Sequence, residues 1–439
     1  MKKKILMGAC LLLLLLLVCC GYGILYTAAG SREVILEFGM FAGSNWDVEN
    51  PNSYTIIDQA IQEFEEENPG VKVHYYSGVL KEDYSEWLSR KLLEDEMPDV
   101  FMVLDDDFNL FSSLGVMKNL DELMEKDIGF EKEDFYSITL ENGKYEGHQY
   151  ALPYENVPML MFVNKTLLEQ AGIQMPSEDW TWEEMYEICR KVTRDSDGDG
   201  MIDQFGTYNY SWLEAAYSNG EQIFDMTGRE CYLAGEGVAK AIRFSEKISD
   251  LNQGQKVTQE DFYSGSVAFM PLSFARYRTY KMYPYKIKKY QDFQWDCITF
   301  PSEEQGKNRS VVDCLLMGIS DRTRHETLAW EFLKKLTCDA DIQMNIMKYS
   351  QGASVLKSVT NSDEAETILL SGMGNSESMI DVQLLNDVIE NGITTPKFTK
   401  YQQALSLADN EISKIFDENK DIDSTLKKAQ RTINNYLRE

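Results

Sequence analysis

Short apolar runs alternate with amphipathic stretches over the first hundred residues that follow the N-terminal region. The apolar runs 34–38, 71–75 and 98–103 have the length and composition of strands. Between them, apolar residues recur at helical spacing over 54–68 and again up to residue 96. This order of strands and helices predicts an α/β fold with a parallel sheet.

The loops that follow the first and third predicted strands carry candidate ligand-binding side chains. Trp46 lies in the first of these loops, and Asp106 belongs to an acidic triplet directly after the third strand. Ligands of parallel sheets bind beyond the carboxyl ends of the strands, so both residues lie at the end of the sheet expected to face a cleft. The competing explanation is a solvated acidic loop and a tryptophan that packs within its loop.

The pattern further along the chain indicates two lobes that are interleaved. A polar, aromatic elbow at 150–158 leads into the apolar run 159–164, which is typical of a crossing strand, and Thr181 with Glu184 forms a capping box for the next helix. The chain has 439 residues and is 43% hydrophobic, enough for two cores. It contains no long linker rich in Pro, Gly or Ser and no internal repeat.

The N-terminus, residues 1–30, has the layout of an export signal or a membrane anchor. Three lysines precede a long apolar run that includes seven consecutive leucines from Leu11. The segment 17–20 resembles a lipobox, which would make Cys20 the site of lipidation. An uncleaved helix reaching Ala29, or cleavage after a loose signal at 27–29, are the alternatives. Each places the folded body outside the cytoplasm.

Charge and reactive side chains limit the possible functions. The formal net charge of -29 disfavours nucleic acid as a partner, because phosphate backbones would be repelled. Beyond the N-terminal run, five scattered cysteines form no CxxC pair, which indicates small buried residues rather than disulfides or zinc ligands. Three unpaired histidines and the lack of a nucleophile or phosphate-loop motif indicate a protein that is not an enzyme.

Several ordered motifs together resemble the extracellular solute-binding proteins of family 1, the group typified by maltose-binding protein. The likeness covers the chain from Val34 to the C-terminus. It is carried by FEEENPGVKV at 64–73, MPDV at 97–100, YALPY at 150–154 followed by NK at 164–165, WTWEE at 180–184, GSVAFM at 265–270 and AWEFL at 329–333.

The resemblance implies a two-lobed fold of the type II periplasmic-binding-protein kind, with a hinge and a central ligand cleft. It assigns 31–155 and 308–360 to the first lobe, and 156–307 and 361–439 to the second. It also implies a sugar or oligosaccharide as ligand and the subunits of an ABC permease as partners. Sugars need aromatic faces and hydrogen-bonding groups. The candidate ligand residues are Trp46, Asp106, Tyr154, Glu155, Trp212, Asn219, Arg276 and Trp295.

The segment 195–203 resembles the calcium loop of an EF-hand. Carboxylates alternate along it and glycines permit the tight turn, so the sequence predicts a structural Ca²⁺ site. The expected ligands are Asp195, Asp197, Asp199, Asp203 and the carbonyl of Met201. The twelfth position is Gly206 where an EF-hand has Glu, and an acidic solvated turn is the alternative.

The sequence therefore predicts an extracytoplasmic, monomeric binding protein at the outer face of the cell membrane. The resemblance implies that it captures a sugar for an importer. A glycan-active enzyme is one alternative, since carboxylates are abundant, although nothing singles out a catalytic pair. A sensory or adhesive surface protein that uses the same clamp is another.

Overall fold

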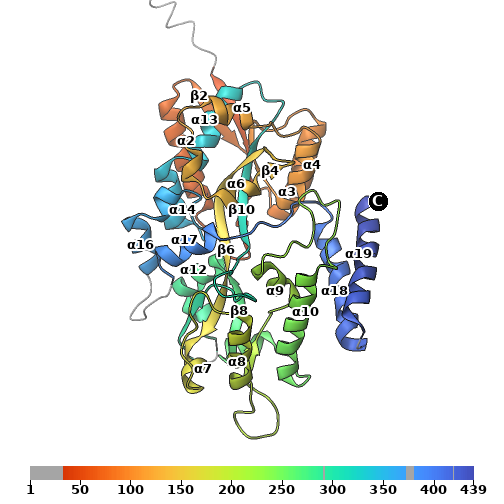
Figure 1. Cartoon of the computed structure of the whole chain (residues 1–439). Coiled ribbons are helices and arrows are strands. Elements are labelled where there is room, and N and C mark those ends of the chain that lie inside the picture. Colours follow the sequence, from red (N-terminus) through yellow and green to blue (C-terminus); the bar gives the residue numbers. More distant parts are fainter. Residues whose placement is uncertain (1–32, 290–291, 372–379, 419) are drawn as a thin grey trace, which may run out of the picture.

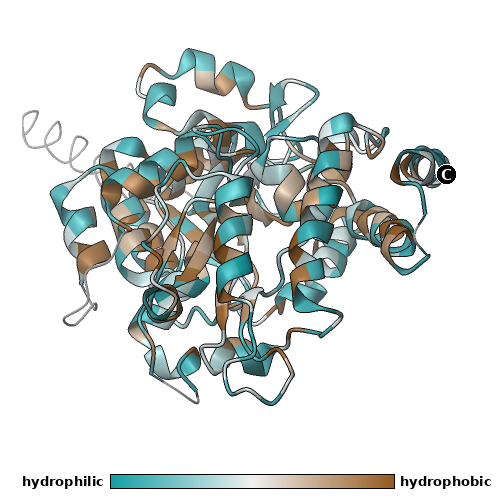
Figure 2. Ribbon diagram, turned by 60° about the horizontal axis from the view of Figure 1, so that its bottom comes forward, coloured by the Kyte–Doolittle hydropathy of each residue, from teal (hydrophilic) through white to brown (hydrophobic). Residues whose placement is uncertain are grey.

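The computed structural model of the chain describes residues 33–289, 292–371, 380–418 and 420–439. Two α/β lobes lie one above the other in Figure 1, and strands β6 and β10 run through the middle of the molecule. Helices surround the strands, with hydrophilic outer faces and hydrophobic faces turned inward (Figure 2). The distribution is that of helices packed on a shared sheet.

In the described residues, one mixed sheet of eight strands extends through both lobes, in the order β2-β1-β3-β10-β6-β8-β7, with β9 also paired to β6. β1 pairs in parallel with β2 and with β3, which confirms the parallel sheet predicted from the N-terminal pattern. The strands are β1 (Val34–Gly39), β2 (Val71–Tyr75), β3 (Val100–Val103), β6 (Ala151–Asn164), β7 (Phe205–Thr207), β8 (Val267–Ser273), β9 (Trp295–Ile298) and β10 (Val312–Ile319), besides the small hairpin β4 (Lys144–Tyr145) and β5 (His148–Gln149).

Strand β6 joins the lobes. Residues 151–158 pair with β10 in the first lobe, and from Met159 onward the strand pairs with β8 and β9 in the second. Nearly every residue of β6 is buried on both faces, which explains its unbroken apolar character after the elbow. The crossing strand expected at 159–164 is thus the second half of the longer strand β6. Because β6 passes from one lobe to the other, the cleft between the lobes lies beside it.

The helices divide between the lobes. The first lobe holds α2 (Ser53–Glu67), α3 (Lys81–Leu93), α4 (Asp105–Ser113), α5 (Asp121–Lys126), α6 (Ser137–Asn142), α13 (Glu326–Thr337), α14 (Ala340–Tyr349), α15 (Lys357–Thr360), α16 (Asp363–Leu370) and α17 (Val382–Glu390). The second holds α7 (Lys165–Gln170), α8 (Trp182–Val192), α9 (Trp212–Ser218), α10 (Glu236–Ser249), α11 (Gln259–Tyr263), α12 (Phe274–Met282), α18 (Tyr401–Glu418) and α19 (Ile422–Arg438).

The third crossover between the lobes differs from the boundary expected at residue 361. Helices α16 and α17 contact α14, α15 and α6 and so stay with the first lobe. The chain returns to the second lobe after α17, where Ile393 bridges to Val311, and it ends in the antiparallel pair α18 and α19 on the outer side (Figure 1). Side-chain packing sets this boundary, which hydrophobic periodicity does not reveal.

Local features that the sequence indicated are present. Thr181 and Glu184 form the expected capping box at the start of α8. The five cysteines beyond the N-terminal region are free and, except for the partly exposed Cys338, buried. Both observations confirm the sequence-based interpretation.

Candidate functional site

A cleft lies between the two lobes, beyond the carboxyl ends of β1 and β3. Two adjoining hollows of about 340 and 410 Å³ form it, and they share Asp105, Asp106, Met159, Asp313 and Gln402. Volumes of this size accommodate small-molecule ligands. The floor comes from β6 and β10, so the cleft lies where the chain crosses between the lobes.

The wall from the first lobe combines one aromatic ring with charged groups. Trp46 and Asp47 follow β1, and Asp105 and Asp106 open α4 directly after β3. Burial lowers the pKa of Lys81, and the nearby carboxylates of Asp105, Asp106 and Asp47 oppose part of this shift. Burial also raises the pKa of Asp106. Because Lys81 also donates to the carbonyl of Asn45, it ties the loop that carries Trp46 to the start of α3.

The wall from the second lobe is mainly aromatic and apolar. The hydroxyls of Tyr217 and Tyr401 are hydrogen bonded at 2.6 Å, and Leu213, Phe300 and Leu405 line the same hollow. Tyr217 lies near the end of α9, and Tyr401 begins α18. Two segments far apart in sequence therefore meet on this side of the cleft.

A buried lysine holds the carboxylates at the base. Lys397 is 3% exposed, and its Nζ lies 2.9 Å from Oδ1 of Asp105. Burial lowers the pKa of Lys397, but Asp105 and Asp313 outweigh that effect, so the net shift is upward. Burial raises the pKa of Asp313 to about 6, against the opposing effect of Lys397.

The structure brings two of the eight predicted ligand residues to the cleft, Trp46 and Asp106. Arg276 lies at its edge, with Nη2 2.5 Å from the carboxylate of Asp47. Asn219 follows α9 and accepts a hydrogen bond from the backbone of Glu303. It therefore joins two segments next to the cleft without lining either hollow.

The other four predicted residues are buried outside the cleft. Trp212 is 4% exposed in the second-lobe core, where its Nε1 donates to Asp409 at 2.8 Å. Trp295 stacks on Phe162 with ring centroids 5.5 Å apart. Neither ring presents a free face for a sugar, unlike the expectation from sequence.

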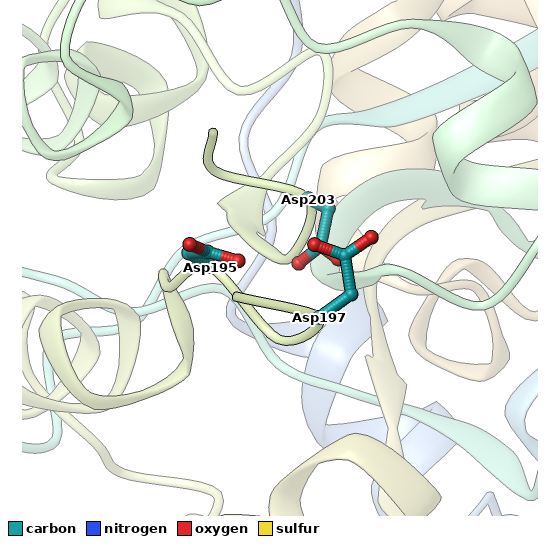
Figure 3. Close-up of side chains that lie close together, drawn as sticks. All are labelled: Asp195, Asp197 and Asp203. Carbon is teal, nitrogen blue, oxygen red and sulfur yellow. The ribbon is translucent and has the colours of Figure 1, made fainter. Parts of the chain in front are cut away.

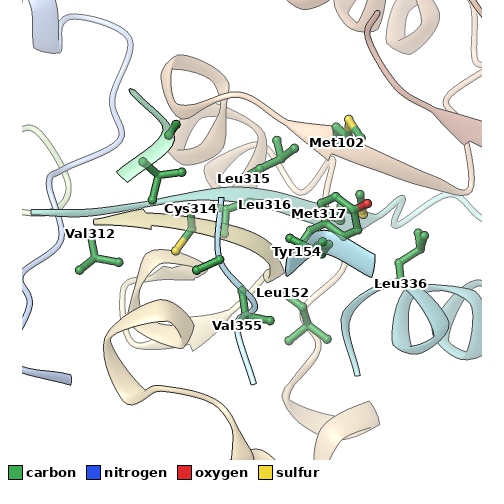
Figure 4. Packing of buried hydrophobic residues seen from close by; sticks show 14 of the residues in the cluster. Met102, Leu152, Tyr154, Val312, Cys314, Leu315, Leu316, Met317, Leu336 and Val355 are labelled. Atoms are coloured by element: carbon green, nitrogen blue, oxygen red, sulfur yellow. The ribbon is translucent and has the colours of Figure 1, made fainter. Parts of the chain in front are cut away.

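Tyr154 and Glu155 are the remaining two. Tyr154 packs in the first-lobe core near Leu152, Met317 and Val355 (Figure 4). The carboxylate of Glu155, which is 3% exposed, accepts hydrogen bonds from Ser350 and from the backbone N–H of Gly352. Neither residue lines the two hollows of the cleft.

Most of the polar groups at the base of the cleft were not predicted from the sequence. Asp313 did carry a signal, since it is the single charged residue in the apolar run 311–319. An isolated acid in a buried strand is a candidate for function, because burial of a charge is costly. Lys397 and Tyr401 offered no such signal, because their place depends on how the C-terminal segment returns to the cleft.

The acidic loop 195–203 lies at the far end of the second lobe, away from the cleft (Figure 1). Carboxylate oxygens of Asp195, Asp197 and Asp203 lie within 4.8 Å of one another (Figure 3). Asp195 accepts backbone hydrogen bonds from Gly200 and Gly198, which lower its pKa. The carboxylate of Asp199 instead accepts from the backbone of Met201 at 2.8 Å.

The N-terminal predictions lie outside the described residues. This applies to the signal or anchor in residues 1–30 and to lipidation of Cys20. Within the part of the chain that the structure does describe, no helix is both long and apolar enough to cross a membrane.

Comparison with known proteins is consistent with this architecture. Residues 49–341 match the family model of the bacterial extracellular solute-binding proteins. A maltotriose-binding protein of Pyrococcus abyssi (strain GE5 / Orsay) is 22% identical over 405 residues, which is 88% of this chain and 81% of the relative.

Solved structures share the fold. The sugar-binding protein MalE from Xanthomonas citri matches with a TM-score of 0.72 and 15% identity, over 92% of this chain and 97% of that one. The cyclic alpha-maltosyl-1,6-maltose binding protein from Arthrobacter globiformis matches with a TM-score of 0.71 and 15% identity, over 93% and 99%. The likeness confirms the two-lobed, type II periplasmic-binding-protein fold expected from the sequence.

Proposed function

Because the chain belongs to the bacterial extracellular solute-binding protein family, we propose that its cleft binds a neutral saccharide and delivers it to an ABC importer. One observation carries the proposal: Trp46 and Asp106 lie on the first-lobe wall, the pair Tyr217 and Tyr401 lies on the second-lobe wall, and Asp313 lies between the two walls. Sugar rings offer C–H faces to aromatic side chains and hydroxyls to carboxylates. The maltotriose-binding relative supports an oligosaccharide.

The arrangement of the walls supports a mechanism by closure. A ligand that contacts both Trp46 and Tyr401 stabilises the closed arrangement of the lobes over the open one, because it gains both sets of contacts only there. The importer can then distinguish the loaded form by its shape. This role is binding without chemical conversion of the ligand.

Calorimetry with a panel of neutral mono- to trisaccharides, including maltotriose, tests the proposal. We expect tight binding of one of them, and Trp46→Ala should weaken it about tenfold or more, equivalent to about 1.4 kcal/mol. Tyr285→Ala is the matched control, since Tyr285 is 68% exposed and does not line the cleft. Binding of none of the sugars contradicts the proposal, and release of cleaved sugar would favour a glycan-active enzyme.

The proposed location is the outer face of the cell membrane. Membership of an extracellular family supports a place outside the cytoplasm, and the basic, apolar N-terminus supports a tether. Fractionation of cells tests it: the full-length chain should sediment with membranes. Cys20→Ala should release it if acylation is the anchor and leave it bound if the apolar segment is.

A further inference from the structure

Two charged residues outside the cleft, the buried Glu155 and the partly buried Arg278, hold one short segment of backbone, residues 347–352, here called the anchor segment. Glu155 Oε1 accepts from the backbone N–H of Gly352 at 2.6 Å and from the hydroxyl of Ser350. Arg278 donates from Nη1 to the carbonyl of Gly352 at 2.8 Å and from Nη2 to that of Met347 at 2.5 Å. Buried charges persist only with such partners.

The anchor segment supports the loop that carries Trp46, residues 45–52, here called the platform loop. Asn50 Nδ2 donates to the hydroxyl of Ser350 at 3.2 Å, and Asn52 Nδ2 donates to the carbonyl of Tyr349 at 3.4 Å. The indole nitrogen of Trp46 is buried, and Trp46 opposes the effect of burial, which raises the pKa of the Glu155 carboxyl. A shift of the anchor segment would therefore move Trp46.

The same segment connects the two lobes. It ends α14 of the first lobe, whereas Arg278 belongs to α12 of the second lobe. The carbonyls at the C-terminus of a helix carry partial negative charge, so a guanidinium is favoured there. Arg276, two residues earlier on α12, pairs with Asp47 of the platform loop. Helix α12 thus touches both the anchor segment and the platform loop.

Glycine at position 352 is required by this arrangement. A Cβ built there would lie 2.3 Å from Oε1 of Glu155 and 2.4 Å from its Cγ. Such contacts are far inside van der Waals distance, so Gly352→Ala would displace the carboxylate without removing a charge. The substitution therefore tests the contact by shape alone.

We propose that Glu155 and Arg278 are positioning residues that lock the anchor segment between the lobes and thereby fix the Trp46 ring in the cleft. Their effect on ligand affinity rests on the proposed binding role of Trp46. Their effect on the position of Trp46 does not depend on that binding role, because it is present in the protein without a ligand. The two can therefore be tested separately.

Acrylamide quenching of Trp46 fluorescence in the full chain without ligand is the direct test. The Trp46 signal is the difference between each variant and the same variant carrying Trp46→Phe. We expect Gly352→Ala, Glu155→Gln and Arg278→Gln to raise the quenching constant of Trp46 about twofold or more. Arg278→Lys should not restore it, because one ammonium cannot reproduce the two diverging donors of the guanidinium. Asn50→Ala, at the surface end of the network, should give a smaller rise.

Two controls separate positioning from general loosening. Gly129→Ala changes a first-lobe glycine away from the anchor segment and the platform loop. Arg243→Gln removes a surface ion pair with Asp423. Both should leave the quenching constant unchanged. The double variant Glu155→Gln with Arg278→Gln should show no more quenching than the stronger single variant, since both act through one segment.

Unchanged quenching in folded Gly352→Ala and Asn50→Ala overturns the proposal, and these two variants decide the matter if the charge variants do not fold. Fully additive effects of Glu155→Gln and Arg278→Gln also overturn it. Failure of the saccharide proposal gives a different pattern, in which quenching responds as expected but Trp46→Ala leaves ligand affinity unchanged.

Discussion

The two walls of the cleft are built in different ways. The first-lobe wall comes mainly from residues in the segments that follow β1 and β3, so Trp46 and Asp106 lie beyond the ends of parallel strands. The second-lobe wall combines the end of α9 with the start of α18, almost two hundred residues later. The first wall follows from local topology, whereas the second depends on how distant segments pack. Substitutions should therefore act differently on the two sides.

The largest effect expected is on stability, from Trp212→Ala on the second-lobe side. Trp212 is packed in the core and hydrogen bonded to Asp409, so its loss should destabilise the chain by about 3–5 kcal/mol. Ligand affinity of the folded fraction should change less than about threefold. Urea unfolding and calorimetry measure the two quantities.

Trp46→Ala should show the opposite balance, with weaker binding and a smaller loss of stability than Trp212→Ala, because Trp46 is only partly buried against the core. Similar behaviour of the two variants would contradict the comparison between the walls. A selective loss of affinity in Trp212→Ala would restore Trp212 as a ligand platform and would mean that the second lobe rearranges on binding.

Trp46 and Trp212 show which parts of the site could be predicted from the sequence and which could not. The alternation of apolar runs predicted the parallel strands and, through them, the place of Trp46 and Asp106. Trp212 was also expected in the cleft, but it is the first residue of α9 after the cap Ser211, and that turn directs it into the core. An aromatic residue at a helix start is compatible with both positions, and packing decides between them.

Long-range packing also explains the groups at the base that sequence analysis missed. Tyr401 lines the cleft, and Lys397 reaches Asp105 at its base, because the chain returns to the second lobe after α17 rather than at residue 361. The fold class was predictable because it depends on periodicity and on ordered motifs. Much of the site was not predictable, because the burial of one lysine between two lobes produces no periodic pattern in the sequence.

The next largest effect is expected where the two walls meet, at Lys397. Lys397→Met keeps the length of the side chain but leaves Asp105 and Asp313 without their shared cation. We expect a loss of stability on the order of 1–3 kcal/mol and about tenfold weaker binding. Adding Asp105→Asn should recover part of the stability, because it removes one unpaired carboxylate. Unchanged unfolding and binding in Lys397→Met would show that the buried pair supports neither.

A smaller effect should follow from the pKa of about 6 at Asp313. The ionised carboxylate accepts hydrogen bonds from ligand hydroxyls, so affinity should fall a few-fold as the pH drops from about 7.5 to 5. Stability should change in the opposite direction. Because burial raises the folded-state pKa above the ordinary value of 3.8, the folded state binds protons more readily, and stability from this group decreases as the pH rises toward 6.

Asp313→Asn separates this group from other carboxyls with raised pKa values. In that variant, the contribution of Asp313 to the pH dependence of ligand affinity and of stability should disappear. The contribution of Asp106 should remain. Calorimetry and urea unfolding at pH 5, 6 and 7.5 measure the difference between the two chains. Identical pH profiles would mean that Asp313 does not titrate in this range.

The smallest effect concerns the acidic loop, far from both walls. We propose that Asp195, Asp197 and Asp203 bind Ca²⁺, since their oxygens lie within 4.8 Å of one another and Ca²⁺ prefers carboxylate ligands. Millimolar Ca²⁺ should raise the melting temperature by a few degrees relative to chelator, because binding stabilises the folded state by mass action. Asp197→Asn should abolish the shift, and Mg²⁺ should not replace Ca²⁺, because Mg²⁺ demands a tighter octahedral shell.

Ligand affinity should stay the same with and without Ca²⁺, since the loop lies at the end of the second lobe opposite the cleft (Figure 1). A melting temperature that does not respond to Ca²⁺ would make the loop a solvated turn, and a change in ligand affinity would mean that the loop influences the second-lobe wall through β7.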